Sequence, residues 1–397
     1  MQAAGREAFQ GRVAVSALFL ANGFVMGAWA PQIPLLLPRH GITEFTLGLL
    51  ILGLGIGAVG AMLFAGRLIA RFGSRAVLRG FALSIVPVLP IVVYAPSVPV
   101  LALAMAILGA LIGCMDVAMN ANAVEVERRL GRAIMSASHG FWSLGGFVGG
   151  SLGGLLIART SAEVQALTVS AVVAVIVLVA MRYLLTEPPA PVHASGVRQA
   201  PAMLPRNGAI WLLGLMAMFS MIPEGAVLDW AALYMLDELG TPAERSGLAF
   251  AFFSGAMAVM RFAGDALRNR FGAVQTLRAS GLTGAAGLLI AALAPSDTVA
   301  LVGFFLSGLG VANMVPIMFS AAGNFPGMGA GAALSTVTMV GYAGILVAPS
   351  SIGFVAEAVG FRQTYGALAL LLVGVTMMAG RTASADVMRP DQRVAAT

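Results

Sequence analysis

The chain has 397 residues, of which 59% are hydrophobic and only 10% are charged, and its formal net charge is +6. Soluble domains carry about 25% charged residues, so this composition excludes a soluble enzyme and a disordered protein. A disulfide scaffold is excluded because Cys114 is the single cysteine. All 23 basic residues are arginine, which excludes Schiff-base and P-loop lysine chemistry.

Twelve apolar segments are long enough to cross a bilayer, which takes roughly 20 helical residues. They cover residues 13–37, 46–70, 76–95, 98–124, 133–157, 163–185, 209–235, 246–268, 273–294, 298–321, 331–356 and 361–380. The sequence therefore predicts an all-α membrane protein of twelve transmembrane helices. Its expected parts are an N-terminal tail (1–12), a six-helix bundle (13–186), a polar, proline-rich linker (187–208), a second six-helix bundle (209–380) and a C-terminal tail (381–397).

The arginines predict the topology. If both termini are cytoplasmic, eighteen arginines fall in inner segments, and only Arg39, Arg159, Arg245 and Arg362 fall in outer ones. The remaining arginine, Arg261, lies within a helix. This asymmetry follows the positive-inside rule, so we expect both termini in the cytoplasm. It also assigns the net positive charge to membrane topology, and we expect no nucleic-acid partner.

The two halves of the sequence repeat. Arg71-Phe72-Gly73 follows the second apolar segment, and Arg270-Phe271-Gly272 follows the eighth, 199 residues later. Repeated six-helix bundles place a substrate site near the bilayer midplane, between the halves.

A loop motif gives the chain a family resemblance. The run GRLIARFGSR (66–75) is similar to the signature GxLaDrxGrr of the major facilitator superfamily. The matching residues are Gly66, Leu68, Arg71, Gly73 and Arg75. Ala70 stands where the signature has an aspartate, whereas the second copy, RFAGDALRNRFG (261–272), keeps an acid at Asp265.

A narrower resemblance is to the fucose-permease-like branch of that superfamily and its uncharacterised bacterial relatives. It is carried by DVAMNANAVEVE (116–127), HGFWSLGG (139–146) and EGAVLDW (224–230). The resemblance implies two pseudo-symmetric bundles that transport a solute by alternating access.

Polar side chains inside membrane helices are costly, so they are the functional candidates. Asp116 and Asn120 lie one turn apart on one face of segment 98–124, and His139 reaches a similar depth on segment 133–157. A carboxylate beside an imidazole can carry a proton. Trp142 follows His139 on the same side and could stack on a sugar ring. The alternative is a hydrogen-bonded clamp between the two helices, with Trp142 filling space.

Glu224 lies just past the midplane of segment 209–235, directly after Pro223, which removes a backbone donor. We expect it to bind a proton or substrate, and together with Asp116 and His139 it forms the predicted proton-coupling set. The alternative is a protonated side chain bonded to a freed carbonyl. Asp229, further out, is an outer-gate or substrate candidate.

The remaining candidates come from several helices. The expected substrate contacts are Asn22, Gln32, Asn120, Trp142, Asp229, Asn313 and Tyr342, with bundle packing as the alternative for Tyr342. Arg261 and Asp265, one turn apart near the inner end of segment 246–268, are predicted to be either a cytoplasmic gate pair or a fixed ion pair that stiffens the loop motif.

Glycines recur every fourth residue in segment 133–157, in two interleaved sets. The sets are Gly145, Gly149 and Gly153, and Gly146, Gly150 and Gly154. Small residues at this spacing let helix backbones approach closely. We therefore predict close helix packing within the first half.

The sequence has no metal-ligand spacing and no Walker motif. We therefore expect a secondary carrier without cofactors, driven by the proton gradient, and not an enzyme. Amides, an imidazole and few basic groups favour a neutral polar solute, sugar-like or a related metabolite. The alternatives are a proton-driven exporter of cationic or amphipathic compounds and, remotely, a non-transporting receptor on a carrier fold. We expect a monomer in the bacterial inner membrane, with the solute and the lipid bilayer as its partners.

Overall fold

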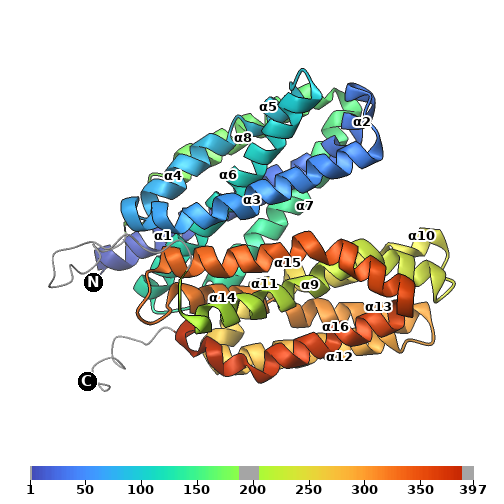
Figure 1. Ribbon diagram of the computed structural model, residues 1–397. Helices are drawn as coiled ribbons and strands as arrows, with labels where there is room; N and C mark the ends of the chain where they lie inside the picture. The colour runs from blue at the N-terminus through green and yellow to red at the C-terminus, as the bar shows by residue number, and fades with distance from the viewer. Residues whose placement is uncertain (1, 187–204, 387–397) are drawn as a thin grey trace. The chain divides into compact units, whose positions relative to one another are not determined.

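The computed structural model describes residues 2–186 and 205–386 and is helical over nearly all of them (Figure 1). Most of the expected linker, 187–204, and the end of the expected C-terminal tail, 387–397, lie outside the described residues. By its internal contacts the chain divides into two compact units. The first comprises Met1–Ile134, Ser138–Arg206 and Gly327–Thr336, and the second comprises Met135–Ala137, Asn207–Pro326 and Val337–Thr397.

The N-terminal half of the chain supplies nine helical elements. In order they are α1 (Gln2–Trp29), η1 (Ala30–Leu35), α2 (Leu36–His40), α3 (Glu44–Phe72), α4 (Ser74–Ile85), α5 (Val88–Val93), α6 (Val98–Leu130), α7 (Met135–Arg159) and α8 (Ala162–Ala180). All belong to the first unit except the start of α7, Met135–Ala137, which belongs to the second.

The C-terminal half supplies another nine. They are α9 (Gly208–Asp237), α10 (Ala243–Ser246), α11 (Leu248–Phe271), α12 (Ala273–Ala292), α13 (Asp297–Val311), α14 (Met314–Gly323), α15 (Ala330–Val359), α16 (Phe361–Met377) and η2 (Ala379–Ala385). The start of α15, as far as Thr336, belongs to the first unit.

Helices lie in all twelve segments that the sequence predicts to span. Within the described residues, nine are long and apolar enough to cross a bilayer, or ten if α16 and η2, bent by 56°, form one span. Segment 76–95 falls short because it is broken into α4 and α5 at Pro87, which has no backbone N–H to donate. Segment 273–294, α12, carries glutamine, threonine and arginine in its first half.

Both expected tails are partly folded. Helix α1 begins at Gln2, and its Gly11 packs against the side chain of Leu185. After α16 the chain forms η2, and the carboxylate of Asp386 accepts a hydrogen bond from the backbone N–H of Ala273, at the start of α12. Helix α1 therefore begins within the expected N-terminal tail, and η2 extends into the expected C-terminal tail.

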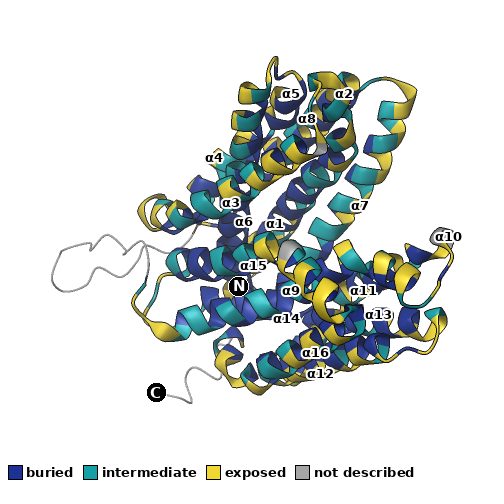
Figure 2. Cartoon of the chain, turned by 45° about the vertical axis from the view of Figure 1, so that its right-hand side comes forward, coloured by how far each residue is buried: buried dark blue, intermediate teal, exposed yellow. Residues whose placement is uncertain are grey.

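Figure 2 shows that most helices have both buried and exposed residues, and many of the exposed residues are large and apolar. Phe147 of α7, for example, is 72% exposed. In a water-soluble protein such a surface would aggregate, whereas lipid tails are a suitable solvent for it.

Direct backbone contact joins α1 and α7 in the first unit. A Cβ added at Gly145 would lie 2.1 Å from the carbonyl oxygen of Leu20, and one added at Gly149 would lie 2.3 Å from that of Phe24. From the α1 side, a Cβ at Gly23 would lie 2.0 Å from the carbonyl oxygen of Trp142. The predicted close packing is therefore confirmed for Gly145 and Gly149.

The second glycine set packs less closely against α1. At Gly146 the nearest atom to an added Cβ is the carbonyl oxygen of Gly23, at 3.8 Å, and at Gly150 it is that of Gly27, at 3.5 Å. These are ordinary van der Waals distances, so only one of the two predicted sets is sterically required.

Alanine substitutions at the neighbouring Gly145 and Gly146 should therefore differ in their effect on stability. Gly145→Ala should lower the free energy of unfolding by about 1–3 kcal/mol, because the new methyl group collides with backbone that cannot move aside. Gly146→Ala, the matched control, should leave stability unchanged. Melting temperatures of the purified variants in detergent check this, and equal values for the two would contradict the α1–α7 contact.

Candidate functional site

A polar chain links α6 and α7 in the first unit. Nε2 of His139 and Oδ1 of Asn120 are hydrogen-bonded at 3.2 Å, and Nδ2 of Asn120 donates to the backbone carbonyl of Asp116 at 2.9 Å. The ring of Phe19, from α1, lies 5.1 Å from the His139 ring between centroids. The structure thus brings Asn120 and His139 together, as their predicted depths require.

Asp116 is buried in α6, with only 3% of its surface exposed. Its Oδ2 atom has no hydrogen-bond partner among the described residues. A buried carboxylate oxygen without a partner is costly when ionised and far less so when protonated. This is the chemistry that a proton-binding residue requires.

Asn22 of α1 and Trp142 of α7 form a second pair. Nε1 of Trp142 donates to Oδ1 of Asn22 at 2.9 Å. The close approach of Gly23 to the Trp142 backbone sets this geometry, because Asn22 precedes Gly23 on α1. Nδ2 of Asn22 is buried and has no hydrogen-bond partner within the described part of the chain. The pair therefore retains one unused donor.

Gln32, a predicted substrate contact, lies in a different cluster. Its Nε2 donates to Oε1 of Gln165 at 2.6 Å and to the carbonyl of Ala162 at 2.9 Å. Nε2 of Gln165 in turn donates to the carbonyl of Ala28 at 2.9 Å. These bonds join η1, α8 and α1, so the contacts of Gln32 are structural ones.

In the second unit, Glu224 of α9 pairs with Arg261 of α11. Nη2 of Arg261 and Oε2 of Glu224 are 3.5 Å apart. The sequence analysis places Arg261 near the inner end of its helix, but α11 continues to Phe271, ten residues further, or about 15 Å. Arg261 therefore lies near the middle of its span and reaches the carboxylate of another helix.

Asp265 caps a helix. Its Oδ1 accepts the backbone N–H of Ser136 at 2.9 Å and its Oδ2 that of Ala137 at 2.8 Å, and both donors belong to the second unit. They are the first residues of α7, where a carboxylate complements the helix dipole. Arg261 thus pairs with Glu224, and both Asp265 oxygens receive backbone donors.

The two copies of the loop motif have the same backbone. Gly73 and Gly272 adopt φ values of 80° and 81°, which favour glycine, and each precedes the first residue of the next helix. The guanidinium of Arg71 lies 5.0 Å from the Phe72 ring centroid, and Arg270 is placed in the same way over Phe271. In the first copy Gly66 packs against the backbone of Gly331 and Ala332, both in the first unit.

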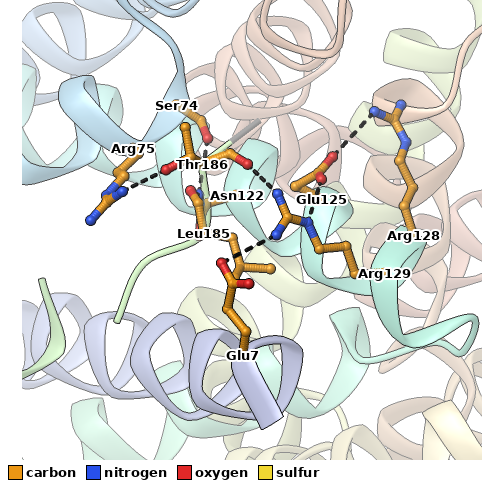
Figure 3. Close-up of polar contacts among 9 residues, drawn as sticks. All are labelled: Glu7, Ser74, Arg75, Asn122, Glu125, Arg128, Arg129, Leu185 and Thr186. Carbon is orange, nitrogen blue, oxygen red and sulfur yellow. Dashed lines mark hydrogen bonds and ion pairs between the residues drawn. The ribbon is translucent and has the colours of Figure 1, made fainter. Parts of the chain in front are cut away.

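Arg75 belongs to a network that the sequence analysis missed (Figure 3). It donates to the hydroxyl of Thr186 at 2.5 Å, while Arg129 donates to the carbonyl of Thr186 and pairs with Glu125 at 2.9 Å. Asn122 donates to the carbonyl of Leu185 at 3.0 Å. The network holds the end of the first bundle in place. Its partners are far apart in the sequence, so no local sequence pattern predicts it.

The other candidates are spread over the second unit. Asn313 is buried at the break between α13 and α14, close against Gly264, and neither atom of its amide has a hydrogen-bond partner among the described residues. Asp229 is exposed on α9, and Tyr342 is half-buried on α15. Among the described residues, no group of three or more histidine, cysteine or acidic side chains could hold a metal ion.

The profile of the Major Facilitator Superfamily matches residues 15–267 and 213–392. The chain belongs to the major facilitator superfamily. It is 35% identical over 368 residues to an uncharacterised MFS-type transporter of Yersinia pestis, covering 93% of this chain and 94% of that one. This superfamily member is therefore a secondary transporter and an integral multi-pass membrane protein, not an enzyme.

Solved structures of the superfamily share the fold. The E. coli fucose:proton symporter superposes with a TM-score of 0.71 at 19% identity, covering 94% of this chain and 99% of that one. A proton:xylose symporter gives 0.73 at 13% identity, covering 95% and 96%. The predicted superfamily and its all-helical architecture are confirmed.

The Gln32–Gln165 bond predicts energetic coupling. Gln32→Leu and Gln165→Leu should each lower the melting temperature, and a double-mutant cycle should give a coupling of about 0.5–3 kcal/mol. Gln165→Leu combined with Ser254→Ala, an exposed hydroxyl bonded within α11, is the control and should be additive. If Gln32→Leu leaves stability unchanged and uncoupled, Gln32 is available for substrate.

Proposed function

We propose that this transporter couples the movement of a neutral polar solute, sugar-like or a related metabolite, to protons across the bacterial inner membrane. It works as a monomer without cofactors, and the proton gradient supplies the energy. The single observation that carries proton coupling is the buried Asp116, whose Oδ2 lacks a hydrogen-bond partner within the described residues. In lipid-embedded protein such a carboxylate is most stable with a proton bound.

The chain from Asp116 through Asn120 to His139 supports the same role. The imidazole of His139 can donate or accept a proton, and its Nε2 is held by Asn120. Alternating access would expose Asp116 first to one side of the membrane and then to the other. Proton release on one side and uptake on the other then drives the solute.

The chemistry of the first unit supports a hydroxyl-bearing solute. Amides donate to and accept from hydroxyl groups, and an indole offers an apolar face to a sugar ring. Nδ2 of Asn22 is an unused donor beside the Trp142 indole. Two of the solved structures that share the fold are a fucose:proton and a proton:xylose symporter, which favours the same class.

Export of organic cations is the second candidate. It is favoured by acidic groups on α9 that remain accessible, since Asp229 is exposed and the Glu224 side chain is 34% exposed. In this alternative the carboxylates would bind the positive charge of the compound.

Proton coupling is tested in two steps. A thermal-shift screen of neutral monosaccharides and related metabolites first identifies a ligand, because a compound that binds only the folded state raises the melting temperature. In proteoliposomes, entry of that ligand should then acidify the lumen, as reported by a pH-sensitive dye. Asp116→Asn should abolish acidification and uphill uptake while ligand exchange at equal concentrations continues.

The control is Asp297→Asn. It removes a carboxylate that pairs with Arg245 at 3.2 Å and belongs to the second unit, whereas Asp116 belongs to the first. It should acidify the lumen like the parent. Parental acidification by Asp116→Asn would show that Asp116 does not carry the proton.

A further inference from the structure

The pair of Glu224 and Arg261 brings opposite charges together in the interior of the second unit. Each residue lies ten or more residues from either end of its own helix, α9 or α11, and so at least about 15 Å along it. Arg261 is the one arginine that the sequence analysis assigns to neither side of the membrane. Two ions at this depth are stable because each compensates the other.

The two members of the pair differ in accessibility. The side chain of Arg261 is 9% exposed, whereas that of Glu224 is 34% exposed. The guanidinium is therefore shielded by protein and the carboxylate is the reachable partner. A carboxylate directed at lipid tails would be costly, so the exposed part of Glu224 faces water or a solute.

This arrangement discriminates among solutes by charge. An anion could reach the buried guanidinium only by displacing Glu224. A cation could approach Glu224 but would meet a fixed positive charge whose Nη2 is 3.5 Å from the carboxylate oxygen. A neutral donor meets neither obstacle, because a carboxylate with one arginine contact keeps further lone pairs for hydroxyl or amide hydrogens.

Neighbouring residues on α11 fit a neutral ligand. Gly264 follows Arg261 by one turn, and the amide of Asn313 packs against it with both polar atoms unpartnered among the described residues. Asp265, one turn beyond Arg261, is directed at the backbone N–H groups of Ser136 and Ala137. The carboxylate of Asp265 is therefore bound by backbone donors of α7.

We infer that Arg261 is a specificity-determining residue, which closes the carboxylate of Glu224 to organic cations by neutralising it. The inference rests on the proposed function in one respect: Glu224 must lie on the path of the solute. It assigns the carboxylate of Glu224 to a neutral hydrogen-bond donor, and it opposes cation export.

The test is a gain of binding. Tetraphenylphosphonium, a permanent organic cation, is titrated against the purified full-length protein in nanodiscs. Arg261→Gln should bind it at least about tenfold more tightly than the parent, because Glu224 then keeps its charge without a counter-ion. The double variant Glu224→Gln/Arg261→Gln should lose that gain, and Arg261→Lys should bind like the parent.

Two further variants serve as a control for the loss of charge and as a second test of the pair. Arg278→Gln removes the same charge from an exposed position on α12 and should bind the cation like the parent. Glu224→Asp keeps both charges but shortens the side chain by one methylene, which weakens the pair with Arg261. It should therefore bind the cation more tightly than the parent, though less tightly than Arg261→Gln. This variant provides a test if Arg261→Gln does not fold. Melting temperature and monodispersity are measured for every variant.

Two results would overturn the inference: a parent that binds the cation as tightly as Arg261→Gln, or a gain that persists in the double variant. The assay needs no flux and no proton gradient. Failure of proton coupling would therefore appear in the Asp116 experiment alone, and failure of charge selection here alone.

Discussion

The backbone contact between α1 and α7 is the constraint on which the first unit depends. Because Gly23 and Gly145 have no side chains, the two helices approach until each backbone touches the other. That approach puts Asn22 within hydrogen-bond distance of Trp142 and the Phe19 ring against His139. The polar cluster is thus a product of steric fit, and its geometry would be lost with any larger residue at the contact.

The two units accommodate ionisable side chains inside the membrane in different ways. The first buries Asp116 next to the amide of Asn120, which is hydrogen-bonded to the imidazole of His139, and so surrounds this acid with neutral groups. The second holds opposite charges as a pair, Glu224 with Arg261. One topology, repeated, therefore supports two electrostatic environments, of which one suits proton exchange and the other suits recognition of an uncharged solute.

Much of the helical architecture could be predicted from the sequence because the length of an apolar span is a property of a single segment. The meeting of Asn120 and His139 was also predictable, since depth along consecutive helices follows from counting residues. The contact between Arg261 and Glu224 was not predictable, because Glu224 lies 37 residues away on another helix. Helices that are apolar on nearly all sides give no periodicity to indicate which faces meet, so the bond between Gln32 and Gln165 was not predictable either.

The two loop motifs also show which features the two halves of the chain have in common. Gly73 and Gly272 retain φ values within a degree of each other, although Ala70 and Asp265 show that the nearby acid is present in one copy and absent from the other. A backbone shape that L-residues rarely adopt leaves no substitute for glycine, whereas a cap can be replaced by tight packing, as at Gly66. The two halves can therefore differ in the charged residues of the motif, but both need a glycine where the backbone has a positive φ.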